Sequence, residues 1–179
     1  MIASNAALSI NAEQLSKIPL VQSGEGSQPY QEVFEQLTRI KQANLSLKYA
    51  YILTTTEKTG ILQFVVDADP LPKIITAQCL TSLPGDLYDA REIPELINAY
   101  SGPSADKSIK KDPWGIFVSG YAPIRDSGGN PMAIIGVDAE ATFLQLMQDN
   151  IKVAARIALI TGILFIFSLV ITIIPAIFE

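Results

Sequence analysis

Residues 114–138 read WGIFVSGYAPIRDSGGNPMAIIGVD, in which apolar and small polar residues alternate on both sides of a Gly-Gly pair. Alternation with a period of two is typical of a half-buried strand, and paired glycines favour a tight turn. The stretch therefore predicts two antiparallel strands joined at Gly128 and Gly129. The chain then continues, without a Gly or Pro before Gly162, into a helical segment and an apolar tail.

A two-residue turn would fix the partner of every residue in this hairpin. Counting outward from Ser127 and Asn130 gives three further predicted pairs: Arg125 with Met132, Tyr121 with Gly136, and Ser119 with Asp138. Ser119, Tyr121 and Asp138 then lie on one face of the sheet. The opposite face is apolar and is formed by Val118, Ala122, Ile124, Ile135 and Val137.

Residues 47–69, LKYAYILTTTEKTGILQFVVDAD, predict a second hairpin, because β-branched and aromatic residues flank the turn-prone EKTG. Placing Tyr51 opposite Val65 puts four polar or aromatic side chains on one face: Tyr49, Tyr51, Gln63 and Asp67. The same register leaves five apolar side chains for the core: Ala50, Ile52, Leu62, Phe64 and Val66.

The rest of the first 156 residues alternates between helical and turn-rich patterns. Helical spacing predicts a helix over residues 1–18, broken near Asn11, and an amphipathic helix over residues 30–43. Residues 69–112 hold five of the eleven prolines and one short helical pattern, IPELINAY, so they predict a long crossover. The order of elements predicts an α+β fold: a PAS-like antiparallel sheet with N-terminal helices packed on one face, followed by a C-terminal transmembrane helix.

Residues 157–178 contain no ionisable side chain, and about 20 apolar residues suffice to cross a bilayer as a helix. We therefore predict an N-terminal helix and loop at residues 1–27, a sensor domain at 28–150 and a transmembrane helix at 151–178. The chain is either a piece of a longer protein with an earlier membrane helix or a single-span protein anchored by its C-terminus. Lys152 and Arg156 do not decide its orientation, because the positive-inside rule is weak for large domains.

Composition excludes several functions. The chain has no His and a single Cys, so histidine-based catalysis and His/Cys metal sites are absent, and no cofactor is predicted. The net charge of −5, without a run of Lys or Arg, argues against nucleic acid as a partner. An acidic cluster, Asp86, Asp89, Glu92 and Glu95, matches no EF-hand spacing, so a solvated surface is favoured over a divalent cation site.

The two polar sheet faces together predict a small-molecule pocket with this lining: Tyr49, Tyr51, Gln63, Asp67, Trp114, Ser119, Tyr121 and Asp138. The alternative is a solvated sheet face. Trp114 would either wall the pocket or cap the core, and Asp138 would accept a ligand ammonium, cap the following helix, or do both. Because a buried carboxylate needs a partner, Asp67, Tyr121 and Asp138 favour a cationic or amine-bearing ligand.

The stretch WGIFVSGYAPIRDSGGNPMAIIGVDAE closely resembles the last two strands of Cache domains, the extracytoplasmic PAS-like sensors of bacterial receptors. LKYAYIL and LQFVVDADP resemble that family's first hairpin, and PGDLYDAREIPEL resembles its crossover, so the likeness covers residues 1–150. The resemblance implies a single sensor module between two membrane helices, the second of which passes ligand occupancy to a cytoplasmic output domain. The Arg-x-Trp-Tyr pattern of amino-acid-binding double Cache domains is absent.

Together with the apolar C-terminal stretch, the resemblance implies the extracytoplasmic small-molecule-sensing domain of a transmembrane receptor in the cell inner membrane. The sensor domain would be periplasmic or extracellular, and the receptor would form a homodimer through its N-terminal and transmembrane helices. The alternative is a membrane-anchored structural or interaction subunit whose PAS-like scaffold binds no ligand. Because the sequence contains no recognisable catalytic motif, both are favoured over an enzyme.

Overall fold

The computed structural model describes the backbone of residues 2–69, 82–112 and 115–177, and it omits the side chains of residues 112, 143–145, 169 and 172–177. The chain divides into two compact units, Met1–Glu140 and Ala141–Glu179, and each is described by itself. The first unit holds the following elements in chain order: α1 (Ile2–Ser9), α2 (Ala12–Leu15), η1 (Gln22–Gly26), α3 (Gln28–Ala43), β1 (Leu47–Thr55), β2 (Ile61–Asp67), β3 (Leu87–Asp89), α4 (Pro94–Asn98), β4 (Ser104–Ala105), β5 (Lys110–Asp112), β6 (Gly115–Arg125) and β7 (Pro131–Glu140).

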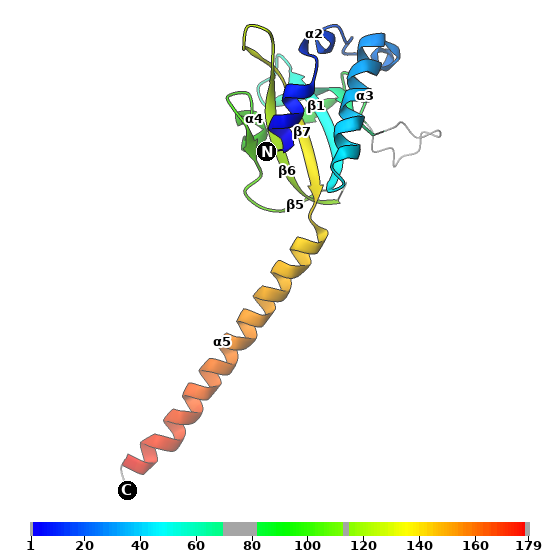
Figure 1. Ribbon diagram of the computed structural model, residues 1–179. Coiled ribbons are helices and arrows are strands. Elements are labelled where there is room, and N and C mark those ends of the chain that lie inside the picture. The colour runs from blue at the N-terminus through cyan, green and yellow to red at the C-terminus, as the bar shows by residue number, and fades with distance from the viewer. Residues whose placement is uncertain (1, 70–81, 113–114, 178–179) are drawn as a thin grey trace. The chain divides into compact units, whose positions relative to one another are not determined.

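The strands form one antiparallel sheet in the order β3-β2-β1-β7-β6-β4, with β5 also paired to β6 (Figure 1). The two predicted hairpins are therefore β1–β2 and β6–β7, and β7 joins them by pairing with β1 at the centre of the sheet. The α+β, PAS-like architecture predicted from the sequence is confirmed.

The centre of the β6–β7 hairpin has the predicted register. Tyr121 pairs with Gly136, and Ser119 pairs with Asp138. The prediction of a two-residue turn is wrong, because a bulge sets Arg125 opposite Pro131, so the turn spans residues 126–130. The Asp126 carboxylate stabilises this wider turn by accepting the backbone N–H groups of Gly128 and Asn130, at 2.9 and 2.8 Å.

The β1–β2 hairpin has a different register from the predicted one. Tyr51 lies opposite Asp67 rather than Val65, and the register shifts between the pairs Ile52–Val66 and Leu53–Phe64. Val65 is the extra residue of a β-bulge in β2. Because one extra residue reverses the alternation of side chains, Phe64 and Leu62 lie on the face opposite Val66.

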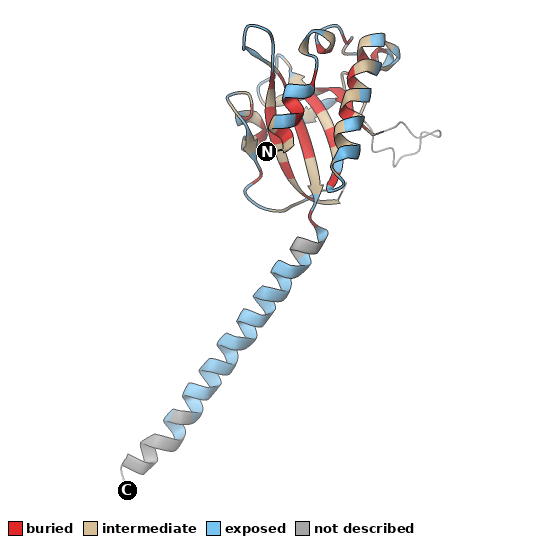
Figure 2. Ribbon diagram, in the orientation of Figure 1, coloured by how far each residue is buried: buried red, intermediate tan, exposed pale blue. Residues whose placement is uncertain are grey.

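The face of the sheet that α1 and α3 cover, with α2 packed on α3, carries the larger apolar core, which we call the helix-side core (Figure 2). The helix α3 begins where the Ser27 hydroxyl accepts the Tyr30 N–H at 3.4 Å, and it turns Tyr30, Val33 and Leu37 toward the sheet. Ala50, Ile52, Val66, Ala122, Ile124, Ile135 and Val137 face it from the strands. The predicted packing of N-terminal helices on one face is thus confirmed.

The other face carries a second cluster, which we call the tyrosine-side core. Leu53, Phe64 and Ile134 come from the central strands, and Leu96 and Ala99 come from the segment containing α4. Tyr51, Tyr88 and Tyr100 pack against this cluster. Part of the crossover therefore covers the face of the sheet that α1 and α3 leave open.

The second unit is the helix α5 (Thr142–Ile177). Its segment Leu146–Ser168 is long and apolar enough to cross a membrane, and it is unburied within the structure. At 1.5 Å per residue its 23 residues span about 35 Å, slightly more than the ~30 Å hydrocarbon core of a bilayer. The transmembrane helix predicted at residues 151–178 overlaps this segment from residue 151 to residue 168.

The prediction that Asp138 caps the C-terminal helix is wrong. Asp138 lies within β7, whose pairing with β6 continues to the pair Phe117–Glu140, and α5 begins only at Thr142. The ladder hydrogen bonds of two further residues keep the chain extended beyond Asp138. The carboxylate is therefore part of the sheet face.

Candidate functional site

Two tyrosines on neighbouring strands flank one glycine on the tyrosine-side face. Tyr51 of β1 and Tyr121 of β6 both pair with Gly136 of β7. A Cβ atom at Gly136 would lie 2.3 Å from Cε2 of Tyr51, so the Tyr51 ring lies directly over the glycine. Phe64 and Tyr88 extend this aromatic group, with ring centroids 5.9 Å from Tyr51 to Phe64 and 5.8 Å from Phe64 to Tyr88.

Asp138 lies two residues farther along β7, on the same face. The Tyr51 hydroxyl donates a hydrogen bond to its Oδ1 at 3.2 Å. Tyr49 and Ser119 are its partners on the two neighbouring strands, and Asp138 itself is half-buried. The Tyr49 ring packs edge-on against Phe117, with a centroid distance of 5.3 Å. Asp138 is thus a carboxylate at the edge of an aromatic surface.

A second carboxylate, Asp106, was not predicted from the sequence. The Tyr121 hydroxyl donates to Asp106 Oδ1 at 3.3 Å, and the Ser119 backbone N–H donates to Oδ2 at 3.2 Å. Lys110 Nζ lies 3.1 Å from Oδ1, and the Asp106 side chain is fully buried. Asp106 follows the two-residue strand β4, too short to show a sequence pattern. Only the KSIKK sequence after it hinted at a nearby cation.

Burial determines the protonation of the two phenols. It raises the pKa of Tyr51 well above the ordinary value of 10.0, and the negative charge of Asp138 raises it further. Burial likewise raises the pKa of Tyr121, with additional contributions from Asp106 and Asp138. Both side chains therefore remain neutral donors at physiological pH. Because their hydroxyls point to different carboxylates, Tyr51 and Tyr121 fix two acidic groups around one aromatic surface.

Lys110 is the cation of this group. Its Nζ lies 3.1 Å from Asp106 and 4.0 Å from Glu95 Oε2, and Glu95 also lies 3.7 Å from Lys107. The Lys110 side chain is 35% exposed, whereas that of Glu95 is 14% exposed. Lys110 therefore holds together a buried and a nearly buried carboxylate beside the tyrosines.

The structure brings together five of the predicted site residues: Tyr49, Tyr51, Ser119, Tyr121 and Asp138. Gln63 does not join them. The bulge at Val65 puts Phe64 on the tyrosine side, so its neighbour Gln63 lies on the opposite face of the sheet. There the Gln63 amide donates to the Thr55 carbonyl at 3.2 Å. The prediction that Gln63 shares the tyrosine face is wrong. Trp114 lies outside the described residues.

Asp67 pairs with Tyr51 along the strands, but its carboxylate binds backbone. Its two oxygens accept the N–H groups of Asp69 and Ser82, at 3.0 and 3.1 Å. Burial raises the pKa of Asp67 to about 6, against the lowering effect of these amides and of Lys41. Lys41 forms an ion pair with Asp69 and lies 5.8 Å from the centroid of the Tyr49 ring. A role for Asp67 in contacting a ligand stays a prediction.

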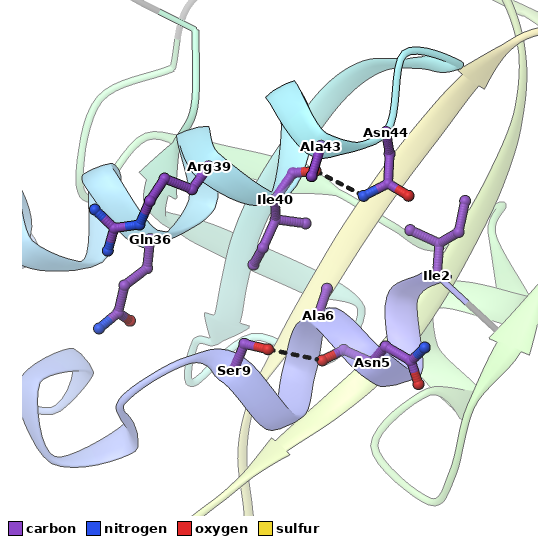
Figure 3. Close-up of a pocket in the computed structure, with 9 residues that line it drawn as sticks. All are labelled: Ile2, Asn5, Ala6, Ser9, Gln36, Arg39, Ile40, Ala43 and Asn44. Atoms are coloured by element: carbon purple, nitrogen blue, oxygen red, sulfur yellow. Dashed lines mark hydrogen bonds between the residues drawn. The ribbon is translucent and has the colours of Figure 1, made fainter.

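A different hollow, of about 530 Å³, lies between α1 and α3 on the helix side (Figure 3). Ala6, Ile40 and Ala43 supply apolar surface, and Arg39 is its charged residue. Three polar side chains at its rim bond to backbone: Ser9 donates to the Asn5 carbonyl, Asn44 donates to the Ile40 carbonyl, and Gln36 Oε1 accepts the Asn11 N–H. Among the residues that the structure describes, no carboxylate lines this hollow, so it offers a ligand ammonium no opposite charge.

The predicted acidic cluster is dispersed. Asp86 accepts the Leu83 N–H at 2.8 Å, Asp89 pairs with Arg91, and Glu95 pairs with Lys110. Over the described ranges 2–69, 82–112 and 115–177, no group of three or more acidic or sulfur ligands lies close enough to hold a metal ion.

Comparison with known proteins identifies the fold. No protein-family model and no curated protein matches the chain. Among solved structures, the ligand-binding domain of the Campylobacter jejuni chemoreceptor Tlp3 in complex with L-valine is similar, with a TM-score of 0.50 and 12% identity, over 80% of this chain and 52% of that one. The sensory domain of Tlp3 with isoleucine bound matches equally, over 80% and 51%. The chain spans about half the length of these domains, and the likeness confirms the fold expected of a Cache-like sensor domain.

Proposed function

We propose that this chain is the small-molecule-sensing domain of a membrane receptor, and that its ligand carries an ammonium group. The observation that carries the proposal is the pair of carboxylates, Asp106 and Asp138, held by two neutral tyrosines on one aromatic face. The likeness to chemoreceptor sensory domains supports a sensor over an enzyme. Those domains bind valine and isoleucine, both of which carry an amine.

The charges and rings favour a cation at this site. Asp106, Asp138 and Glu95 contribute three carboxylates, against the two ammonium groups of Lys107 and Lys110. The Tyr51 hydroxyl is a neutral donor to Asp138, and a ligand ammonium at this carboxylate would add a contact strengthened by charge. The Tyr49 ring already lies 5.8 Å from Lys41 Nζ, so it takes a cation–π contact of a kind worth about 0.5–2 kcal/mol. An anionic ligand would instead meet like charge.

The covalent order of the chain suggests how occupancy is passed on. Gly136 and Asp138 belong to β7, and one residue, Ala141, separates β7 from α5. A ligand that contacts Asp138 therefore acts on the strand that leads directly into the apolar helix. In the proposed receptor, this helix connects to a cytoplasmic output domain that is not in this chain.

Calorimetry on the full chain in detergent micelles tests the ligand class. We expect saturable binding of ethylammonium or L-valine, no binding of succinate, and at least about tenfold weaker binding in Asp138→Asn, since a charge-assisted contact is worth about 1.5–3 kcal/mol. Glu140→Gln is the matched control, because it removes an exposed carboxylate from the same strand. Binding of succinate alone, or an unaffected Asp138→Asn variant, would overturn the amine proposal.

The membrane setting is part of the same proposal. The domain would lie outside the cytoplasm, anchored in the inner membrane by Leu146–Ser168, and the receptor would dimerise through its N-terminal and membrane helices. Cysteines introduced at exposed positions 8 and 153 should crosslink between copies in native membranes, after Cys79→Ser. The cysteine at position 8, outside the membrane span, should also react with an impermeant thiol reagent. A stable heteromeric partner with no ligand response would favour an interaction subunit instead.

A further inference from the structure

The backbone conformation at residue 136 does not explain why this residue is a glycine. Its φ lies outside the left-handed range, so the extended strand would accept any residue there. The space above it is what demands a glycine: an added Cβ would lie 2.3, 2.5 and 2.8 Å from Cε2, Cζ and the hydroxyl of Tyr51. Glycine within a strand often marks the close approach of another group. Here that group is the ring whose hydroxyl binds Asp138.

Gly120 provides the contrast within the same sheet. It also lies in an extended strand, β6, and it pairs with Val137, the residue after Gly136. A Cβ at Gly120 would lie 3.7 Å from Val137 Cγ2 and 3.8 Å from Ala3 Cβ, which are ordinary contacts. A methyl group would therefore meet only ordinary contacts at Gly120, whereas at Gly136 it would displace the Tyr51 ring.

We propose that Gly136 is a positioning residue of the ligand site: its missing side chain lets the Tyr51 ring lie across β7, and the Tyr51 hydroxyl thereby orients the Asp138 carboxylate. This inference rests on the proposed function for the identity of the site. The size of residue 136 then controls how Asp138 meets a ligand, although Gly136 itself supplies no polar group. Any larger residue moves the ring, and the hydrogen bond of 3.2 Å is lost.

A measurement that needs no ligand tests the positioning step. In the full chain in detergent micelles, ultraviolet absorbance of phenolate follows the titration of the tyrosines. Tyr51 of the wild type should ionise only far above pH 10, where burial holds it. In Gly136→Ala one additional phenol should titrate near pH 10, and it should vanish in the double variant Gly136→Ala/Tyr51→Phe. Gly120→Ala should titrate like the wild type.

Binding of ethylammonium and L-valine, followed by calorimetry, supplies the second readout. Gly136→Ala should weaken binding of whichever probe the wild type takes by about tenfold or more, as should Tyr51→Phe, which keeps the ring and removes only the hydroxyl. Gly120→Ala should bind normally. If Gly136→Ala fails to fold, Tyr51→Phe still tests whether the hydroxyl orients Asp138.

The two readouts separate the two proposals. A Gly136→Ala variant that stays folded and keeps the wild-type titration would overturn the positioning role, because the ring would not have moved. Normal binding by Tyr51→Phe would overturn the orientation of Asp138. If the wild type binds neither probe, the amine-sensing function fails, and the titration alone decides whether Gly136 holds the Tyr51 ring.

Discussion

The two faces of this sheet bury their side chains through different kinds of contact. On the helix side, the side chains of Ala50, Ile52 and Ile135 are completely buried in the apolar core. They need close packing but no hydrogen-bond partner. On the tyrosine side, buried Tyr121 and Asp106 require hydrogen bonds and an ion pair. The helix side therefore stabilises the fold by burying apolar side chains. The tyrosine side buries polar groups, whose desolvation costs free energy, and these are the groups that a ligand site needs.

The largest effect should come from breaking the helix side. Ile52 is fully buried at the centre of β1, so Ile52→Ala should lower the free energy of unfolding by about 3–4 kcal/mol through lost burial and a residual cavity. Urea unfolding of the full chain in micelles measures it. The exposed neighbour on the same strand provides the control, Lys48→Ala, with a change within about 0.5 kcal/mol. A loss below 1 kcal/mol for Ile52→Ala would mean that this core is not tightly packed.

The second prediction concerns how the buried Asp67 carboxylate makes the free energy of unfolding depend on pH. The pKa of Asp67 is raised from 3.8 to about 6, so the folded state holds this proton more tightly than the unfolded state. The contribution of Asp67 to stability should therefore fall as pH rises from about 4 to about 6, by up to about 3 kcal/mol. Urea unfolding of wild type and Asp67→Asn at pH 4, 5, 6 and 7 should show the variant lacking this decline. Parallel pH profiles would refute the shift.

The third effect compares a buried ion pair with an exposed one. Asp106→Asn keeps the shape of the side chain but leaves Lys110 without its nearest carboxylate, so we expect a loss of about 2 kcal/mol in urea unfolding. Glu35→Gln removes the exposed pair with Arg39 and should cost at most about 0.5 kcal/mol. Equal effects in the two variants would show that burial does not strengthen the interaction of Asp106.

The smallest effect should come from a single hydroxyl. Tyr121→Phe removes the hydrogen bond of 3.3 Å to Asp106 while keeping the ring, so the expected loss is about 1 kcal/mol. In the Asp106→Asn background the same substitution should cost less, because its partner has changed. Additive losses in the double variant would indicate that Tyr121 and Asp106 do not interact across the tyrosine side.

Sequence reasoning succeeded where the pattern is local. The pairs Tyr121–Gly136 and Ser119–Asp138 follow from alternation and from the position of the glycines, and the bulge at Arg125 does not disturb them. It failed where one extra residue matters: Val65 reversed the faces of Leu62 and Phe64 and moved Gln63 off the tyrosine side. The end of β7 was also missed, because strand pairing with Phe117 overrides the capping preference of Asp138.

The part of the site that sequence could not supply depends on contacts between distant segments. Asp106 reaches Tyr121 because β4 folds against β6, and a two-residue strand carries no periodic signal. The ring of Tyr51 over Gly136 is likewise visible only in three dimensions, although the register places Tyr121 and Gly136 side by side. A glycine inside a predicted strand, away from any turn, was the available hint.

The bulge at Val65 also affects how this chain should be aligned with distant relatives. The extra residue reverses which face of the sheet the side chains of β2 occupy. In an alignment with a relative that lacks it, residues of the tyrosine side would therefore be matched with residues of the helix-side core. An alignment with fixed spacing between Gln63 and Asp67 would then mismatch half of the strand. The segment from Phe117 to Ile124, which pairs with β7 without interruption, is the safer anchor for tracing the ancestry of this site.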